Sequence, residues 1–238
     1  MTKTVIDFHS HVLPGVDDGS ASVEESIALL QAEKQQGISC VIATPHFYAQ
    51  HDTPERFLKR RAAAEERLRE EMVKIPDLPE LKIGAEVYYF KGISDSDVIS
   101  ELTIDSKRCI LLEMPVSPWT DSMYREIENL YVRRGMVPII AHIDRYIGPF
   151  HTFGIPKRLR ELPVLVQANA EFFLNRSTSS MALRMLKNDG IHLLGTDCHN
   201  LKDRKPNLGD AIALINKKLG KDAIMRIQAC EQDVLSGM

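Results

Sequence analysis

Short apolar segments alternate with longer amphipathic segments along this chain of 238 residues, and this alternation is the feature that most constrains its fold. Apolar strands that are each followed by a helix are typical of parallel βαβ units, whose sheet is buried on both faces. Seven such units favour a closed or nearly closed barrel, with an open doubly wound sheet as the alternative. We therefore predict a single α/β domain over residues 1–238. The expected strands span residues 4–9, 38–44, 81–85, 109–112, 137–141, 164–168 and 191–196.

Capping signals mark the ends of several expected helices. A capping box, Ser22-x-x-Glu25, opens the first helix, and Gly37 closes it. Thr53 and Pro54 open the second helix as its N-cap and first-turn proline. Residues 88–107 are expected to form a loop. The remaining helical segments are expected over residues 56–74, 122–134, 156–161, 180–189, 208–219 and 222–235.

Polar side chains gather where the expected strands end. Five of the eight histidines lie at or just past such an end, together with several carboxylates, and no strand start shows the same enrichment. In α/β barrels the loops that follow the strands converge at that rim and form the active site. Imidazoles and carboxylates without thiolates favour a polynuclear metal site. The residues at these strand ends are His9, His11, His46, Glu86, Glu113, His142, Asp197 and His199.

The first expected strand ends in two histidines, His9 and His11, spaced two residues apart. Alternate side chains of an extended strand point to the same face, so both imidazoles can bind at one point past the strand. The carboxylates of Asp17 and Asp18 follow in the next turn.

The other three histidines lack this placement. His192 lies inside the expected strand 191–196 and is interpreted as a hydrogen-bonded core residue. His51 and His151 lie in polar segments and are interpreted as ordinary loop residues.

Bulk composition excludes several classes of protein. A net charge of −3 provides no basic surface for nucleic acid. No apolar run approaches the ~18 residues of a membrane span, and the N-terminus lacks the apolar core of a signal peptide. The four cysteines lie far apart and are expected to be reduced thiols. We therefore expect a cytoplasmic protein that neither binds nucleic acid nor inserts into a membrane.

The ordered set of strand-end motifs resembles the signature of the PHP (polymerase and histidinol phosphatase) superfamily. Within that superfamily, the segments Val16-Asp17-Asp18-Gly19 and His142-Ile143-Asp144-Arg145-Tyr146 resemble the CpsB-type bacterial protein-tyrosine phosphatases. The match runs from residue 7 to about residue 206. The motifs that carry it are His9-x-His11, Asp18, Thr44-Pro45-His46, Gly84-Ala85-Glu86, Leu112-Glu113, Ala141-His142-Ile143-Asp144-Arg145-Tyr146 and Asp197-x-His199-Asn200.

This resemblance implies a distorted (β/α)7 TIM-like barrel of the PHP fold that holds three divalent metal ions. Manganese is the metal usual in the family, with iron and zinc as alternatives. The third ion would be held by Asp18, His46 and His199. Asp17 is interpreted as a residue that caps the loop. The close metal pair, with Glu86 as its bridge, would be held by His9, His11, Glu86, Glu113, His142 and Asp197.

The resemblance also implies a reaction, the hydrolysis of phosphotyrosine on a bacterial tyrosine autokinase of capsule or exopolysaccharide assembly. A metal-bound hydroxide would attack phosphorus, because coordination lowers the pKa of water from ~15.7 to about 7. Arg145 and Arg204 match the family's phosphate-binding arginines, and a guanidinium binds phosphate bidentately. Asp144 stands where relatives commonly carry glutamate, a departure that could change how Arg145 is oriented.

A rival mechanism uses Cys198 and Arg204, which formally satisfy the C-x5-R pattern of cysteine-dependent tyrosine phosphatases. The intervening loop lacks the glycine whose amide would approach phosphate closely. Lys205 stands where a hydroxyl residue would follow the arginine. If the chain is extended here, Asp197 and Cys198 point to opposite faces. We favour the metal-dependent mechanism.

Three other functions remain as alternatives. A histidinol-phosphate phosphatase, or another PHP enzyme for small phosphoesters, would use the same ligands. A TatD-like nuclease or amidohydrolase is disfavoured by the ligands for a third metal and by the acidic charge balance. A non-catalytic scaffold has no need of the complete ligand set. The sequence leaves the oligomeric state open.

Overall fold

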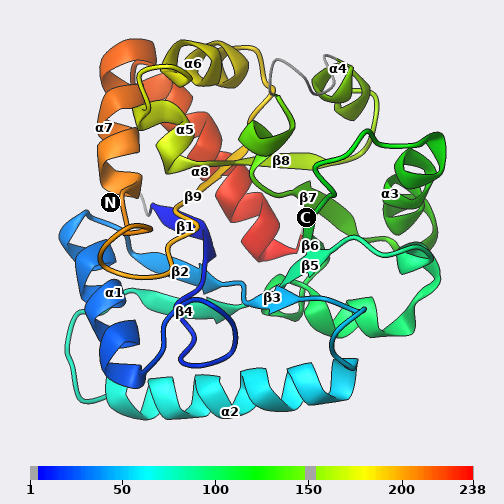
Figure 1. Ribbon diagram of the computed structural model, residues 1–238. Coiled ribbons are helices and arrows are strands. Elements are labelled where there is room, and N and C mark those ends of the chain that lie inside the picture. Colours follow the sequence, from blue (N-terminus) through cyan, green and yellow to red (C-terminus); the bar gives the residue numbers. More distant parts are fainter. Residues whose placement is uncertain (1–4, 148–153, 238) are drawn as a thin grey trace.

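Parallel strands form the centre of the fold, and helices surround them (Figure 1). The computed structural model describes residues 5–147 and 154–237. Its strands are β1 (Ile6–Ser10), β2 (Cys40–Ala43), β3 (His46–Phe47), β4 (Glu80–Ile83), β5 (Glu86–Tyr88), β6 (Cys109–Glu113), β7 (Val137–Ile140), β8 (Leu165–Asn169) and β9 (Leu193–Gly195). They pair in the orders β1-β2-β4 and β3-β5-β6-β7-β8-β9. The result is an α/β fold with a curled parallel sheet.

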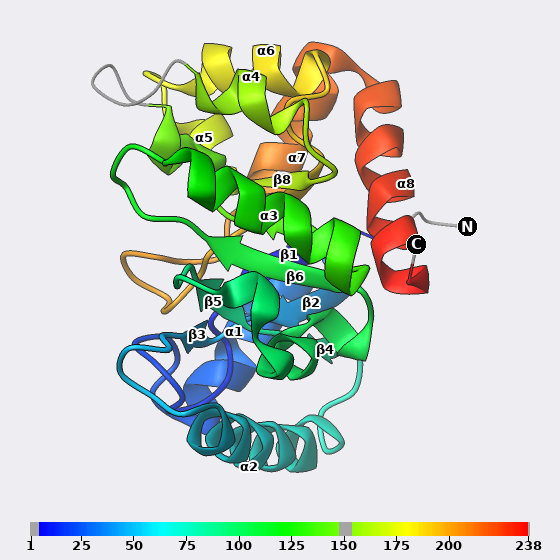
Figure 2. The same ribbon diagram turned by 90° about the vertical axis from the view of Figure 1, so that its right-hand side faces the viewer.

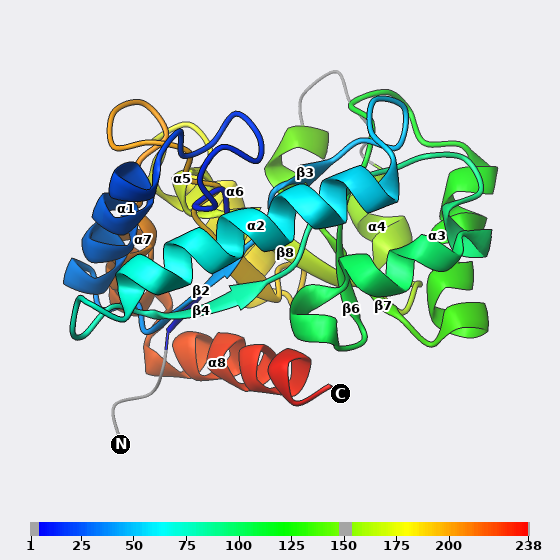
Figure 3. The same cartoon turned by 90° about the horizontal axis from the view of Figure 1, so that it is seen from below.

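The helices lie outside the strands, with α2 along the lower edge of Figure 1, α1 on its left and α3 on its right. Figure 3 shows α8 below the strands and the loops that follow β1, β3 and β9 above them. No helix within residues 5–147 and 154–237 is long and apolar enough to cross a membrane. The helices, including the 3-10 turns η1 to η4, are α1 (Val23–Gln35), α2 (Pro54–Met72), η1 (Ile93–Asp95), η2 (Asp97–Leu102), η3 (Ile104–Ser106), α3 (Asp121–Arg134), η4 (Ile143–Tyr146), α4 (Ile155–Leu159), α5 (Ala170–Leu174), α6 (Ser179–Lys187), α7 (Leu208–Leu219) and α8 (Lys221–Ser236).

Backbone hydrogen bonds connect the two sheets where β2 is followed by β3 and β4 is followed by β5. The Gly84 amide donates to the Ala43 carbonyl at 2.9 Å, and the Glu86 amide donates to the Pro45 carbonyl at 3.1 Å. The parallel pairing of β2 with β4 therefore continues into that of β3 with β5.

The first and last strands also lie side by side. The Asp197 amide donates to the His9 carbonyl at 2.7 Å, and the His11 amide donates to the Cys198 carbonyl at 2.9 Å. Gly195 permits this close approach, because a Cβ added there would lie only 2.5 Å from the Cβ of His9. Both segments that carry predicted ligands are thereby fixed against each other.

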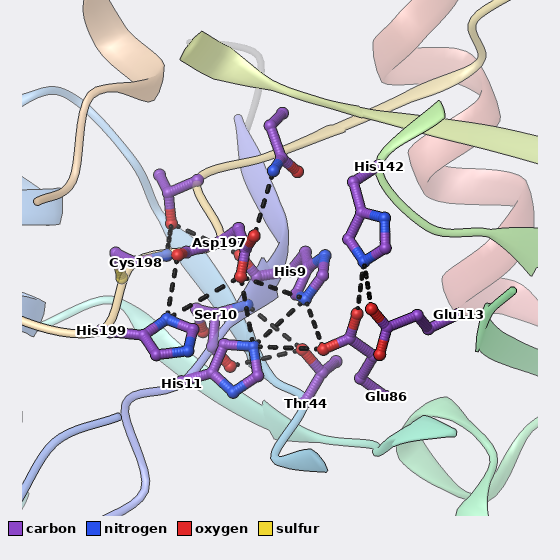
Figure 4. Close-up of polar contacts among 12 residues, drawn as sticks. His9, Ser10, His11, Thr44, Glu86, Glu113, His142, Asp197, Cys198 and His199 are labelled. Atoms are coloured by element: carbon purple, nitrogen blue, oxygen red, sulfur yellow. Dashed lines mark hydrogen bonds and ion pairs between the residues drawn. The ribbon is translucent and has the colours of Figure 1, made fainter. Parts of the chain in front are cut away.

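A bulge in β1 determines which of its side chains point inward. Asp7 pairs with Val41 whereas Ser10 pairs with Ala43, so three steps along β1 oppose two along β2. One extra residue reverses the alternation of faces beyond it. Figure 4 shows the consequence, since the side chains of the His-x-His motif point toward the cluster of polar groups.

Two apolar clusters support this arrangement. The larger one includes the apolar faces of α1, α2, α3 and α7 against the outside of the strands. The smaller one includes Val234 of α8, Ile104 of η3 and apolar residues in or next to the strands. Its buried members are Ile6, Phe8, Cys40, Ile42, Ile104, Cys109, Leu111, Val137, Ile139, Ala141, Leu193 and Val234.

The structure confirms most of the predicted helices and their caps. Ser22 accepts from the Glu25 amide, although the Glu25 carboxylate reaches the Ala21 amide instead of completing the box on Ser22. Thr53 and Pro54 open α2 as predicted.

Other boundaries were wrong. The strand predicted over 81–85 ends at residue 83, and Glu86 begins a separate strand. Residues 88–107 contain the turns η1, η2 and η3 and are not a plain loop, while α5 was missed. Thr4, the predicted start of the first strand, lies outside the described residues.

Candidate metal centre

The nine residues predicted to bind metal lie together, and Figure 4 shows most of them. Most follow or end a strand, whereas His46 and Glu86 begin the short strands β3 and β5 that continue β2 and β4. Convergence of parallel strands at one end explains how residues far apart in sequence meet. They come from β1 and the loop after it, from β3, β5 and β6, and from the loops after β7 and β9. In chain order they are His9, His11, Asp18, His46, Glu86, Glu113, His142, Asp197 and His199.

Glu86 lies at the middle of the cluster and is buried. Its Oε2 atom lies 2.8 Å from Nδ1 of His46 and 3.2 Å from Nε2 of His9. The same oxygen is 3.4 Å from Nε2 of His11, and Oε1 is 2.7 Å from Nε2 of His142. One carboxylate therefore contacts four imidazoles, an arrangement that suits a ligand shared by two metal ions.

Asp197 brings a second carboxylate to the same histidine pair. Its Oδ1 lies 3.6 Å from Nε2 of His9 and 3.3 Å from Nε2 of His11. The Nε2 atoms of those two histidines are 3.2 Å apart. Asp197 has a φ of +55°, a left-handed conformation that is uncommon for residues other than glycine. The local backbone is thus held in a less favourable state at a predicted ligand.

Asp18, His46 and His199 form a second group on the solvent side. The Oδ1 atom of Asp18 lies 3.4 Å from Nε2 of His46 and 3.4 Å from Nε2 of His199. The side chain of Asp18 is 68% exposed, whereas that of His199 is buried. The three predicted ligands of the third ion therefore meet where the cluster opens to solvent.

Both predicted phosphate-binding arginines lie at the edge of the cluster. Arg145 donates to Glu113 at 2.8 Å and to Asp197 at 3.1 Å. Arg204 donates to the other oxygen of Asp197 at 2.5 Å. The two side chains are 34% and 37% exposed, so each guanidinium can be reached from solvent while it remains paired with carboxylates.

The nitrogen and oxygen atoms of the cluster are arranged more like the ligands of metal ions than like hydrogen-bond partners of one another. His11, His46 and His199, or His9, His11 and Glu86, each bring their donor atoms within 4.8 Å of one another. Many imidazole nitrogens and carboxylate oxygens directed at one small region are the usual surroundings of divalent metals. Among the described residues, the buried atoms of this cluster that make no well-aligned hydrogen bond are Oε2 of Glu86 and Glu113, Nδ1 of His46 and His142, and Nε2 of His199. The first of these lies 2.8 Å from Nδ1 of His46, but without the alignment of a hydrogen bond.

The pKa values of the cluster follow from its buried opposite charges. Burial opposes protonation of His11, but the carboxylates of Asp17, Asp197 and Glu86 raise its pKa well above the ordinary value. Burial would raise the pKa of Asp197, yet His9 and His11 hold it far below its usual range. Asp197 therefore remains ionised at neutral pH, as a carboxylate that binds a metal must.

The pKa of His199 is lowered, in contrast to that of His11. Burial, followed by the positive charges of His11 and Arg204, lowers the pKa of His199 to about 4. Its imidazole is therefore neutral at physiological pH and offers a free lone pair.

Asp17 has a role that the sequence interpretation missed. The Nδ1 atom of His11 donates to Asp17 at 2.7 Å, and the His46 amide donates to the same carboxylate at 2.9 Å. Asp17 thus fixes the ring of one predicted ligand and the backbone of another, in addition to holding the loop through the Gly19 amide. Its position in the turn after His-x-His is the signal that could have identified it.

Gln167 and Asn169 of β8 also contact predicted ligands. The side-chain oxygen of Gln167 accepts from the His142 amide at 2.6 Å and lies 3.5 Å from Nδ1 of His9. Asn169 donates to Asp197 at 3.0 Å. Polar residues at alternate positions in an otherwise apolar strand could have marked this inner face.

Cys198 lies behind the cluster and does not face it. Its thiol is fully buried, 4.0 Å from a carboxylate oxygen of Glu33 on α1. Burial, together with the charges of Glu33 and Asp7, raises the pKa of Cys198 well above that of an ordinary thiol. A nucleophilic cysteine requires the opposite shift. The prediction that Asp197 and Cys198 point apart assumed an extended chain, whereas Asp197 adopts a left-handed conformation; the contacts of Cys198 nevertheless lie away from the cluster.

The remaining histidines behave differently. Nδ1 of His192 accepts from the Val166 amide at 3.0 Å, as expected of a hydrogen-bonded residue, but His192 precedes β9 instead of lying within a strand. His51 is exposed, and His151 lies outside the described residues. Asp144 is half-buried and accepts from the Asn169 amide at 3.4 Å, which links η4 to β8.

Fold and cluster together define the class, an α/β protein with a curled parallel sheet whose strand ends carry candidate metal-binding groups. Residues 5–234 match the family model described as "Capsular polysaccharide synthesis, CpsB/CapC", and the chain belongs to this family. The resemblance to CpsB-type proteins is therefore confirmed.

Named relatives support this assignment along almost the whole chain. The chain is 29% identical over 231 residues to the tyrosine-protein phosphatase CpsB of Streptococcus pneumoniae. This match covers 91% of this chain and 91% of the relative. It is 28% identical over 227 residues to the tyrosine-protein phosphatase YwqE of Bacillus subtilis, covering 92% of this chain and 86% of the relative.

A solved structure has the same fold. The crystal structures described as YwqE from Bacillus subtilis and CpsB from Streptococcus pneumoniae, "unique metal-dependent tyrosine phosphatases", include a chain that matches with a TM-score of 0.86. The sequence identity is 23%, and the match covers 98% of this chain and 95% of that one.

Proposed function

We propose that this protein is a metal-dependent protein-tyrosine phosphatase that acts in bacterial capsule or exopolysaccharide synthesis. One observation carries the proposal, namely that four histidines contact the buried Glu86 carboxylate and that two arginines lie at the edge of the same cluster. Membership of the CpsB/CapC family supports the same reading, as do relatives named tyrosine-protein phosphatases.

We further propose that the strands form one distorted (β/α)7 barrel and that residues 1–238 are one domain. Counting β2 with β3 and β4 with β5, the nine strands make seven. The hydrogen bonds between β1 and the segment after β9, and across the gap between the two sheets, support closure of the ring.

Three divalent ions, with manganese as the expected metal, would be held by the nine ligands. His9, His11 and Asp197 would hold one side of a close pair. Glu113 and His142 would hold the other, and Glu86 would lie between the two. Asp18, His46 and His199 would hold the third ion. When bound, such ions supply a nucleophile at neutral pH and positive charge for phosphoryl oxygens.

The chain's own residues would bind and orient the phosphate. Arg145 and Arg204 lie on opposite sides of Asp197 and keep part of each guanidinium exposed. We expect both to donate to the phosphoryl oxygens, because a planar guanidinium matches them in a fork geometry. Their pairing with Glu113 and Asp197 would hold the side chains ready before substrate arrives.

The expected substrate is a phosphotyrosine of a bacterial tyrosine kinase of the capsule assembly system. A phenolate is a better leaving group than an alkoxide, which suits a site where we identify no general acid among the described residues. None of the four cysteines, all of which lie in the described residues, forms a disulfide, which supports our proposal of a cytoplasmic location.

One panel of assays tests the proposal against its alternatives. Purified protein with Mn²⁺ is assayed on a phosphotyrosine peptide, on histidinol phosphate and on single-stranded DNA. We expect efficient turnover of the peptide alone. Preference for histidinol phosphate would favour a small-molecule PHP phosphatase, and cleavage of DNA would favour a nuclease.

A further inference from the structure

Two tyrosines extend the row of predicted ligands toward solvent. Tyr48 follows His46 by two residues, and Tyr88 follows Glu86 by two. The parallel register sets His46 opposite Glu86, so alternation places both tyrosines on the face that carries the ligands. They stand about 6–7 Å further along the strands, at roughly 3.3 Å per residue.

The two rings contact each other and the metal centre. The ring centroids of Tyr48 and Tyr88 are 5.5 Å apart, tilted by 43°. The Tyr48 ring also lies 5.2 Å from the imidazole of His46. Separations and tilts of this kind are those of favourable aromatic pairs. Tyr48 is thus held between a predicted ligand and a second aromatic ring.

Tyr48 also lines a cavity of about 480 Å³ beside the cluster. The predicted ligands Asp18 and His46 also line this cavity, as do His51 and Arg56. This space is large enough for an aromatic side chain and part of the peptide that carries it. A ring entering from the cavity would meet Tyr48 before its phosphate reached the ligands.

Resting on the phosphatase function proposed above, we propose that Tyr48, backed by Tyr88, is the surface that recognises the aromatic group of an aryl phosphate ester. An aryl ring can pack against Tyr48 while its phosphate is bound by the metals and arginines. An alkyl phosphate, such as that of serine, leaves the Tyr48 face without a partner. The pair thereby contributes selectivity for aryl over alkyl esters.

Binding of non-hydrolysable phosphonates tests this role without turnover. Dissociation constants of phenylphosphonate and methylphosphonate are measured by calorimetry on the manganese-loaded protein. The Tyr48→Leu variant should bind phenylphosphonate roughly 3- to 10-fold more weakly, the range expected for a lost aromatic pair. Its affinity for methylphosphonate should change by less than about twofold.

Two variants serve as matched comparisons. Tyr48→Phe keeps the ring and should retain most of the affinity for phenylphosphonate. Tyr131→Leu removes a tyrosine that is 43% exposed on α3 and should change neither constant. Equal weakening of both phosphonates in Tyr48→Leu would overturn the inference, because it would mean that Tyr48 acts through the ligand His46. Unchanged binding of both would also overturn it.

Failure of the proposed phosphatase function would give different results from failure of the aryl-recognition inference. A protein that does not hydrolyse phosphotyrosine peptides, yet distinguishes the two phosphonates through Tyr48, would contradict the phosphatase activity and leave the aryl surface in place. If the protein hydrolyses the peptides, and the Tyr48→Leu variant binds each phosphonate as tightly as the parent does, the phosphatase function would stand and the aryl surface would be contradicted.

Discussion

The Oδ2 atom of Asp17 lies 2.7 Å from Nδ1 of His11. The contact directs Nε2 of His11 toward Glu86 and Asp197. Although His11 would become less basic on burial, carboxylates around it raise its pKa, and Asp17 is the first of these. Asp17, which is adjacent in sequence to the predicted ligand Asp18, therefore orients a different predicted ligand, His11.

The Asp17→Asn variant should bind manganese about 10- to 100-fold more weakly, because the His11 ring loses its charged partner. Equilibrium dialysis at several metal concentrations measures this change. Asp95→Asn, at a side chain that is 71% exposed, is the control and should bind as the parent does. Parent-like affinity in Asp17→Asn would mean that the contact does not orient the ligand.

Changing Cys198 to serine should leave phosphatase activity nearly normal. The thiol is buried against Glu33 and its pKa is raised, so it cannot act as a thiolate near neutral pH. The measurement is kcat/KM on a phosphotyrosine peptide with the bound metal quantified in parallel. Loss of nearly all turnover in a metal-loaded variant would support the C-x5-R mechanism instead.

Changing Arg145 to alanine should reduce the rate by about 10²–10³, because a charged contact to the phosphoryl group is lost. Its ion pairs with Glu113 and Asp197 require that metal content be measured in the same preparation. Arg133→Ala removes an exposed ion pair between α3 and Asp95 of η1 and should leave the rate unchanged. A fully active, metal-loaded Arg145→Ala enzyme would refute the assigned role.

Glu231 on α8 should make stability depend on pH. Burial raises its pKa to about 8, from an ordinary value of 4.5, so the folded protein holds a proton there that the unfolded chain releases. The contribution of Glu231 to the free energy of unfolding is therefore complete below about pH 4.5 and is lost as pH rises toward 8. The loss is at most about 1.4 kcal/mol per pH unit.

Urea unfolding at pH 6 and pH 9 tests this expectation. The difference in unfolding free energy between Glu231→Gln and the parent should shift in favour of the variant at pH 9. Glu128→Gln, at an exposed position on α3, should show no such shift. A parent and variant that respond to pH alike would show that Glu231 is ionised in the folded state.

Much of the fold could be predicted because local signals were strong. The apolar segment ending at Glu113 was identified correctly, as was the helix closed by Gly135, since burial and capping agreed there. The break before Glu86 was missed because Gly84 and Ala85 read as a continuation of an apolar strand. Only the pairing of Gly84 with the neighbouring strand reveals that the ladder bends at this point.

The candidate site, like the fold, could be predicted from the sequence only in part. Ligand types at strand ends were visible in the sequence, because residues such as His46 and Asp197 interrupt apolar runs. The bulge between Asp7 and Ser10 was not visible, since it depends on pairing with β2. The contact of Gln167 with His142 also needed the tertiary structure, because 25 residues separate them.

Metal dependence is the central claim, and one titration tests it most directly. Protein freed of metal by chelation and dialysis is titrated with Mn²⁺, and bound metal and hydrolysis of a phosphotyrosine peptide are measured in the same samples. We predict no detectable turnover without metal, and a rate that rises with occupancy and levels off at three ions per chain. Full turnover in a sample with almost no bound metal would contradict the account.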